Sequence, residues 1–223
     1  MSSPSETQPS GDGKSTMHID PAQIEERDQY KLMTGSIVPR PIALVTTLGP
    51  LGPNAAPFSL FNMVGSAPCM LMFSVGNQSD GSDKGTLQNI KHLPEFVVHI
   101  CNEDIAEKMN ICSTDFEHGV NEMERAGFTP LPALKVRPPR IAEAPVQMEC
   151  RLIKIVDFGT RHHVVFGEVL MFHFHDGIVN KRYHVDVEKL HPIGRLSGSL
   201  YAKVRDPFRM DRPYLGETPK QLT

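Results

Sequence analysis

Residues 54–89 read NAAPFSLFNMVGSAPCMLMFSVGNQSDGSDKGTLQN, and this stretch decides how the rest of the chain is interpreted. Two apolar runs, 54–61 and 69–75, predict strands joined by a short turn. A loop rich in Gly, Ser and Asp follows and leads into a helix predicted over 83–92. A helix N-terminus presents unpaired N–H groups that suit a phosphate, although on composition alone an ordinary capped surface turn is the more common origin of such a loop.

The segments on either side of this stretch add strands and one helix. Residues 42–48 form a β-branched, apolar run that predicts a strand, and residues 95–101 (EFVVHIC) predict another. Residues 21–31 have helical spacing with Pro21 at a first-turn position, and we expect this helix to cap one end of the fold.

The second half of the chain continues the strand pattern after a connector rich in proline, which cannot be a central strand and should cross the surface. Residues 146–152 alternate between apolar and polar side chains, so we expect a half-exposed antiparallel strand with Gln147, Glu149 and Arg151 on its solvent face. Residues 163–175 predict a long strand. The fold class is therefore mainly β, an antiparallel barrel with short helical insertions.

Composition and charge limit the domain organisation and the partners. Residues 1–17 are predicted to be a disordered arm, residues 18–210 one domain, and residues 211–223 a C-terminal tail. The net charge of −3 without a basic run argues against nucleic acid, and the apolar runs are too short to cross a membrane, so a cytoplasmic protein is expected. The four cysteines lack CxxC spacing and are expected to be free thiols, three of them within apolar patterns.

Several ordered motifs carry a resemblance to a known family: PRPIALVTT at 39–47, APFSLFN at 56–62, DKGTLQNI at 83–90 and GRLSGSLY at 194–201. In this order they resemble the flavin-reductase-like family of FMN-binding split β-barrel proteins. The resemblance implies a six-stranded split barrel, a homodimer with FMN near the subunit interface, and hydride transfer from NAD(P)H to flavin N5. Because the cofactor carries the reactive chemistry, we expect no catalytic acid–base residue.

The loop that opens the helix is the predicted phosphate end of the cofactor site. Similar proteins often carry Lys-Asp-Thr there, at positions that hold the FMN phosphate. Lys84 and Thr86 take the first and third positions, Gly85 stands where the family has Asp, and Asn89 can face the loop one turn later. The resemblance therefore implies cofactor-binding roles for Lys84, Thr86 and Asn89.

The strand that contains APFSLFN is the predicted ring end of the site. In similar proteins this segment lines the flavin, which implies cofactor-binding roles for Ser59, Phe61 and Asn62. On a regular strand, however, Ser59 and Asn62 fall on opposite faces, so one of them would face solvent. A β-bulge near Asn62 would let both reach the ring.

Three further residues are candidate substrate-binding groups. Arg195 and Tyr201 lie in the GRLSGSLY motif, and Arg40 precedes the first strand. Arg195 can orient an anionic substrate or the nicotinamide nucleotide, while a surface arginine beside a tight turn is about as common an origin of this pattern. The pair His173 and His175 could share a strand face, but no further ligand at suitable spacing completes a metal site, and none is expected.

Three functions remain open at this stage. The first is an FMN-dependent NAD(P)H oxidoreductase of the flavin reductase type, with free flavin as its small-molecule acceptor and a monooxygenase as a partner. The second is direct reduction of a small aromatic substrate such as a nitroaromatic acid. The third is a non-enzymatic FMN electron carrier.

Overall fold

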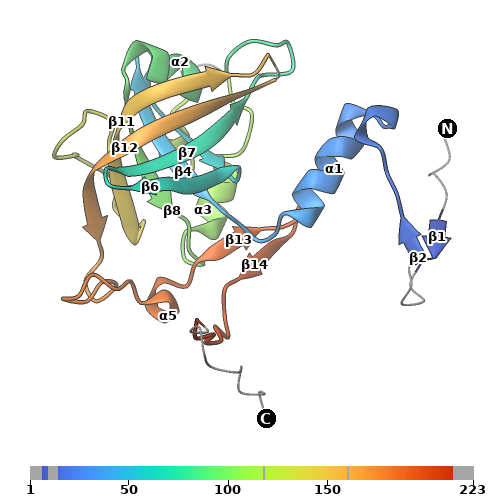
Figure 1. Cartoon of the computed structure of the whole chain (residues 1–223). Coiled ribbons are helices and arrows are strands. Elements are labelled where there is room, and N and C mark those ends of the chain that lie inside the picture. Colours follow the sequence, from blue (N-terminus) through green and yellow to red (C-terminus); the bar gives the residue numbers. More distant parts are fainter. Residues whose placement is uncertain (1–6, 10–14, 118, 160, 213–223) are drawn as a thin grey trace.

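The structure is a computed structural model that describes residues 7–9, 15–117, 119–159 and 161–212. Its centre is one antiparallel sheet of seven strands in the order β5-β4-β8-β11-β12-β7-β6 (Figure 1). In chain order these are β4 (Ala43–Gly49), β5 (Gly52–Phe58), β6 (Phe61–Ser66), β7 (Cys69–Gly76), β8 (Glu95–Ile100), β11 (Val146–Asp157) and β12 (His162–Phe174). The expectation of a mainly β, antiparallel fold is confirmed.

The sheet closes on itself through a link of two residues. β5 and β6 stand at opposite ends of the strand order, yet only Ser59 and Leu60 separate them in sequence. A chain advances at most about 3.5 Å per residue, so the two edges must approach each other. The Ser74 N–H donates to the Leu60 carbonyl at 2.9 Å, and the Phe58 and Phe73 rings lie 5.1 Å apart. The stretch 54–61, predicted as one strand, is thus divided between two edges of a barrel.

The remaining elements are short, and most of them lie around this barrel. The helices are the 3-10 helix η1 (Pro21–Gln23), α1 (Glu26–Ser36), α2 (Gly85–His92), α3 (Ala106–Ile111), α4 (Glu122–Arg125) and α5 (Val187–Leu190). The other strands are β1 (Thr7–Pro9), β2 (Ser15–Met17), β3 (Arg40–Pro41), β9 (Pro130–Leu131), β10 (Arg140–Ile141), β13 (Ile193–Arg195) and β14 (Tyr201–Lys203). Among the described residues, none of these helices is long and apolar enough to cross a membrane.

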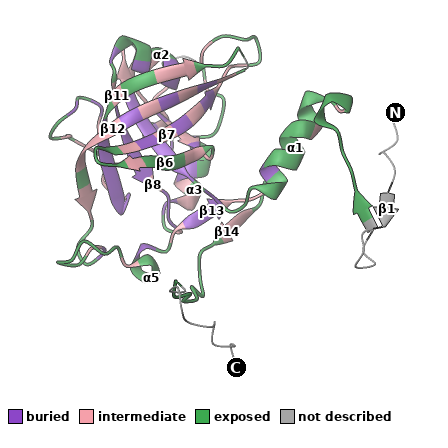
Figure 2. Cartoon of the chain, viewed as in Figure 1, coloured by how far each residue is buried: buried purple, intermediate pink, exposed green. Residues whose placement is uncertain are grey.

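Two large apolar clusters and a smaller one around Val146 and Ile178 hold the barrel strands and the elements beside them, and Figure 2 shows the buried residues in purple. One large cluster fills the interior around Phe73 and Phe96, whose ring reaches so close to Gly167 that a Cβ there would stand 2.4 Å from its Cζ. The other large cluster lies outside β4, where Leu44 packs with Met109 of α3 and with Met123 of α4. β4 is buried on both faces because these short helices cover it. Cys101, Cys112 and Cys150 are buried free thiols and Cys69 is exposed, as predicted for free cysteines.

The prediction that β11 is half exposed is wrong for its first half. Gln147 and Glu149 are 3% and 0% exposed, whereas Arg151 is exposed as predicted. The cause is the connector of residues 130–145, which folds back over this face of the strand. Its backbone cannot join the sheet ladder, so the two polar side chains of β11 bind it instead.

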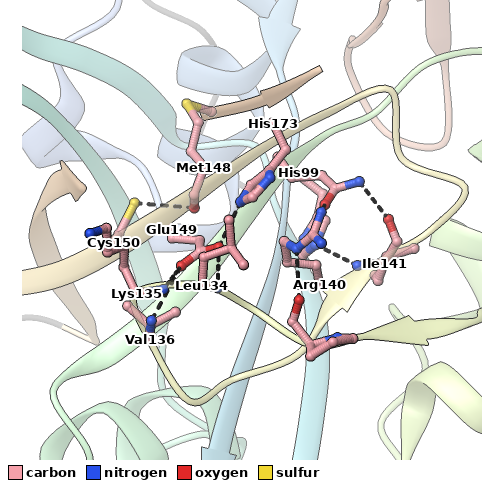
Figure 3. A network of polar contacts seen from close by, with 12 residues as sticks. His99, Leu134, Lys135, Val136, Arg140, Ile141, Met148, Glu149, Cys150 and His173 are labelled. Carbon is pink, nitrogen blue, oxygen red and sulfur yellow. Dashed lines mark hydrogen bonds and ion pairs between the residues drawn. The ribbon is translucent and has the colours of Figure 1, made fainter. Parts of the chain in front are cut away.

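We call these contacts the connector network (Figure 3). Glu149 accepts hydrogen bonds from the backbone N–H groups of residues 134, 135 and 136 at 2.6–3.2 Å, and His173 Nε2 lies 2.6 Å from its Oε1. Gln147 Nε2 donates to the carbonyls of Ile141 and Ala144, both at 3.0 Å. Alternation predicted polar positions correctly, but burial by a distant segment changed what they face.

His99 completes the connector network from β8. The Ile141 N–H donates to His99 Nε2 at 2.9 Å, so Nδ1 carries the ring proton and donates to the Leu44 carbonyl at 2.9 Å. Burial lowers the pKa of His99 to about 4, which agrees with a neutral ring. Both histidines considered for metal are engaged in this region: His175 Nε2 lies 2.9 Å from the Ala142 carbonyl of the connector, and His173 contacts Glu149.

The N-terminal helix does not cap the barrel as expected. α1 begins at Glu26 and extends away from the barrel, with Thr34 as its one buried residue (Figures 1 and 2). Apolar side chains on it, such as Tyr30 and Met33, are exposed rather than packed on the sheet. The helix is attached at its C-terminal end, where Arg40 binds its last carbonyls.

The two predicted terminal segments are described only in part. Within the arm predicted to be disordered over 1–17, residues 7–9 and 15–17 pair as the antiparallel strands β1 and β2, which differs from disorder at those positions. Residues 1–6 and 10–14 lie outside the described residues. So does the predicted C-terminal tail, apart from Asp211 and Arg212.

Candidate functional site

A cavity of about 480 Å³ lies between the start of α2, strand β5 and the segments 112–117 and 119–122. The α2 side contributes Lys84, Gly85, Thr86 and Asn89 to its lining. The β5 side contributes an apolar wall of Ala56, Pro57 and Phe58. The structure therefore brings the predicted phosphate end together with part of the strand predicted to line the ring.

The N-terminus of α2 is the cationic end of this cavity. Lys84 is the N-cap residue in extended conformation, and no side chain among the described residues caps the helix. Lys84 Nζ lies 3.4 Å from Asp115 Oδ1, with the two side chains 42% and 93% exposed. An ion pair this exposed contributes little, so Lys84 can leave Asp115 for a bound anion. Backbone N–H groups, the helix dipole and one ammonium group thus point to an anion site.

Thr86 and Asn89 use their polar groups to hold α2 on the sheet. Thr86 is 2% exposed, and its hydroxyl donates to Asn54 Oδ1 at 2.8 Å. Asn89 Nδ2 donates to Thr47 Oγ1 at 3.1 Å, and a Cβ added at Gly49 would stand 1.8 Å from Asn89 Oδ1. Gly49 is therefore required for the close approach of this side chain. Direct contact of either residue with a phosphate stays a prediction.

Glu122 of α4 belongs to the same cavity wall and was missed at the sequence level. Its Oε1 accepts from Asn54 Nδ2 at 2.6 Å, and its Oε2 accepts from the Ala55 N–H at 3.1 Å. Burial raises the pKa of Glu122, and hydrogen bonds, including those from Ala55 and Asn54, offset part of that effect. Nothing local in the sequence links Glu122 to Asn54, which lies 68 residues earlier.

A second cavity of about 350 Å³ adjoins the first, since Pro57 and Ser113 line both. It contains the three predicted substrate-binding residues, Arg40, Arg195 and Tyr201, and also Ser59. Asn54, Lys84 and Arg195 are thus placed along one continuous region of the surface. The sequence motifs that carry these residues are far apart in the chain, and the fold brings them together.

Arg40 and Arg195 differ in how far their guanidinium groups are already used. Arg40 is buried; its NH1 donates to the Thr34 and Ile37 carbonyls at 2.5 and 2.7 Å, and its NH2 donates to the Leu196 carbonyl at 2.9 Å. Arg195 donates to the Tyr201 hydroxyl, and its Cζ lies 4.4 Å from the centre of that ring. Within the described part of the chain, neither arginine forms an ion pair with a carboxylate.

The observations on fold and site agree with a comparison against known families. Residues 34–189 match the model of the flavin reductase like domain. The chain belongs to the flavin reductase-like family. It is 45% identical over 175 residues to an uncharacterized protein of Aquifex aeolicus, covering 78% of this chain and 89% of the relative.

Two solved structures of the flavin reductase-like fold are close to this chain. Nitrilotriacetate monooxygenase component B from Bacillus cereus superposes with a TM-score of 0.85 at 34% identity, covering 88% of this chain and all of that one. The 2-nitrobenzoate 2-nitroreductase of Pseudomonas fluorescens superposes with a TM-score of 0.83 at 37% identity, covering 92% of this chain and all of that one. Their barrel agrees with the mainly β split barrel described above.

The first cavity fits the group that a flavin reductase-like protein would hold. Its volume lies in the range of small-molecule sites, and it joins an apolar wall to a cationic helix start, as the ring and the phosphate of a flavin nucleotide require. A Cβ added at Gly85 would meet its nearest neighbour, Asn54 Nδ2, at an ordinary 3.7 Å. Packing around the Cβ position therefore does not require glycine there.

Phe61 and Asn62 of the predicted ring end lie on β6, and neither lines the two cavities. Phe61 is half-buried and packs against the barrel interior. Asn62 is exposed, and its side-chain oxygen accepts a hydrogen bond from the Met63 N–H at 2.9 Å. An irregularity interrupts the pairing of β6 with β7 between Met63 and Gly65, just past the predicted position. The contact of these two residues with a flavin ring stays a prediction, whereas Ser59 lies beside the substrate candidates.

Proposed function

We propose that this chain is an FMN-dependent NAD(P)H oxidoreductase that acts as a flavin reductase. The observation that carries the proposal is the pair of adjoining cavities: one begins at the cationic start of α2, the other contains Arg195 and Tyr201, and Pro57 and Ser113 line both. A flavin site beside a second site is the arrangement needed when a nucleotide and then an acceptor must reach the same ring.

Each part of the site has a definite task in this proposal. Lys84 and the first N–H groups of α2 bind the phosphate, and Pro57 and Phe58 exclude water from one side of the ring. A bound FMN would supply the redox chemistry, hydride transfer from NAD(P)H at flavin N5 and delivery of the electrons to an acceptor. Arg195 and Tyr201 orient the nucleotide or the acceptor in the second cavity. No side chain needs to act as an acid or base.

The proposal includes a homodimer and a monooxygenase that receives reduced flavin. Supporting the dimer, the edge strand β6 exposes Met63 and Val64, and α1 exposes Tyr30 and Met33. Light scattering on a size-exclusion column should give twice the monomer mass, and Met63→Lys should lower that mass if β6 is part of the interface. A monomeric wild-type protein would contradict the dimer.

Two measurements test the central proposal. The purified protein should bind FMN, and it should oxidise NADH or NADPH faster when free FMN is added as acceptor, followed by loss of nucleotide absorbance. A protein that takes up no flavin would refute the assignment. A protein that binds FMN but oxidises neither nucleotide would instead be an electron carrier.

A second candidate is direct reduction of an aromatic acid. It is favoured by the lining of the second cavity, which has two arginines, two tyrosines and no carboxylate, and by 37% identity to a 2-nitrobenzoate 2-nitroreductase. With bound FMN, 2-nitrobenzoate should then accelerate NAD(P)H oxidation more than nitrobenzene, which lacks the carboxylate. Equal rates with both compounds would count against this candidate and leave the flavin reductase activity in place.

A further inference from the structure

A series of hydrogen-bonded polar side chains runs along the wall of the first cavity at its phosphate end, and two of them, Thr47 and Thr86, are buried. Asn89 Nδ2 donates to Thr47 Oγ1 at 3.1 Å, and the Thr47 hydroxyl lies 3.4 Å from Asn54 Oδ1. The Thr86 hydroxyl donates to that same oxygen at 2.8 Å, and Asn54 Nδ2 donates to Glu122 Oε1 at 2.6 Å. Four elements, α2, β4, β5 and α4, meet in this series, which we call the Asn54 network.

The chemistry of Glu122 fixes the direction of the whole network. A carboxylate offers only acceptors, and its second oxygen is already taken by the Ala55 N–H. Asn54 must therefore turn its amide nitrogen toward Glu122 and its oxygen toward the threonines. The single hydroxyl proton of Thr86 is used by that oxygen, so only lone pairs of Thr86 remain for other partners.

We propose that Glu122 is a positioning residue for the phosphate end of the cofactor site. By orienting the Asn54 amide it holds Thr86, and with it the first turn of α2, in the place where the backbone N–H groups and Lys84 meet a phosphate. The phosphate is then recognised by those N–H groups and Lys84, while the Thr86 hydroxyl supports them from behind. This inference rests on the proposed function, because it concerns how FMN is held.

The alternative is that Glu122 acts on a bound phosphate only through its negative charge. Glu122 lines the first cavity, and within the described residues it forms no ion pair. A charge there would repel a phosphate, whereas two acceptors that hold Asn54 and Ala55 would favour its binding. When the carboxylate is replaced by an amide of the same shape, the positioning role predicts weaker binding of the phosphate and the electrostatic role predicts stronger binding.

The test compares FMN with riboflavin, which lacks the phosphate. The ratio of the riboflavin Kd to the FMN Kd, measured by fluorescence titration, reports the phosphate end alone. The amide introduced by Glu122→Gln has one acceptor oxygen and one donor nitrogen in place of two acceptor oxygens. The variant therefore loses one of the two hydrogen bonds, or the Asn54 amide reverses its orientation. The ratio should fall at least about fivefold, the scale of one hydrogen bond. The control Glu143→Gln, also at a carboxylate that accepts backbone N–H bonds, should leave it within about twofold.

A double-mutant cycle shows whether the effect passes through the network. In a Thr86→Val background, Glu122→Gln should change the ratio by less than about twofold, because the link is already cut. Additive effects, an unchanged ratio in Glu122→Gln, or a ratio that rises would each overturn the proposal, the last by showing repulsion of the phosphate.

Two further controls separate a folding defect, and a failure of the proposed function, from a failure of the role of Glu122. Should Glu122→Gln fail to fold, Asn54→Ala cuts the same link while Glu122 keeps its bond to Ala55, and an unchanged ratio there would overturn the proposal as well. If the wild-type protein itself binds riboflavin as tightly as FMN, the phosphate site of the proposed function fails. If the wild type prefers FMN and Glu122→Gln prefers it equally, only the role of Glu122 fails.

Discussion

Two glutamates, the buried Glu149 of the connector network and the half-buried Glu122 of the Asn54 network, have pKa values that are shifted in opposite directions. Burial alone raises the pKa of a carboxyl group. In Glu149 this effect is outweighed by hydrogen bonds from the backbone of Leu134 and Lys135 and from His173, so its pKa is lowered. In Glu122, with donors from Ala55 and Asn54, burial dominates and the pKa is raised.

The difference shows how one residue type serves two purposes. Glu149 has its acceptors filled and fixes a segment of main chain, with no cavity beside it among those described here. Glu122 is less fully hydrogen-bonded and forms part of a cavity wall. The glutamate with more donors only fixes main chain, and the one with fewer donors also lines a cavity.

The largest expected effect is on stability at Glu149. Glu149→Ala leaves three backbone N–H groups and His173 without their acceptor, so the free energy of unfolding should fall by about 3–5 kcal/mol in urea titrations. Glu168→Ala removes only a partly exposed ion pair with Arg151 and should cost less than about 1 kcal/mol. Similar losses in both variants would remove the contrast between the two glutamates.

The next effect is the pH dependence that His99 gives to the connector network. Its folded pKa of about 4 lies below the unfolded value of 6.5, so the unfolded state binds the proton first. The stability contributed by neutral His99 is complete above pH 6.5 and is lost as the pH falls to about 4, by roughly 3 kcal/mol. Urea unfolding of the wild type and of His99→Gln at pH 7.5 and 4.5 should show a smaller loss in the variant; equal losses would contradict this.

A smaller effect is expected at the cationic end of the first cavity. Lys84→Ala should weaken FMN binding about tenfold, the scale of one charge-assisted contact, and leave riboflavin binding nearly unchanged. Lys91→Ala is the matched control, since Lys91 lies in the last turn of α2 and pairs with Asp83. Equal weakening of FMN binding in both variants would mean that the overall positive charge of α2, rather than Lys84 itself, attracts the phosphate.

The smallest effect directly contrasts the two glutamates. Because the folded pKa of Glu122 is raised, its stabilising contribution is present below pH 4.5 and is lost as the pH rises through the raised value. Glu122→Gln should therefore cost less stability at pH 8 than at pH 5, by a difference below about 1 kcal/mol. Glu149→Gln should cost at least as much at pH 8 as at pH 5, and the same sign in both variants would refute the contrast.

The sequence predicted those parts of the molecule that depend on neighbouring residues. Alternation and turn residues predicted the strands, and the loop before residue 85 predicted the start of helix α2. The anion-binding role of Lys84 came from the family resemblance and stays a prediction. The exposure of Gln147 and Glu149 was predicted wrongly because the connector that covers them cannot be deduced from the strand itself. Glu122 was missed for the same reason: its contact with Asn54 depends on how the whole barrel places α4.

The wall shared by the two cavities at Pro57 and Ser113 has a consequence for the size of the ligands. A ligand anchored at Lys84 and long enough to pass Pro57 would fill both cavities and leave no room for a second molecule. A ligand that ends before Pro57 would leave the Arg195 end open. The position of Pro57 and Ser113 therefore sets how long a ligand held at Lys84 can be before it reaches the second cavity.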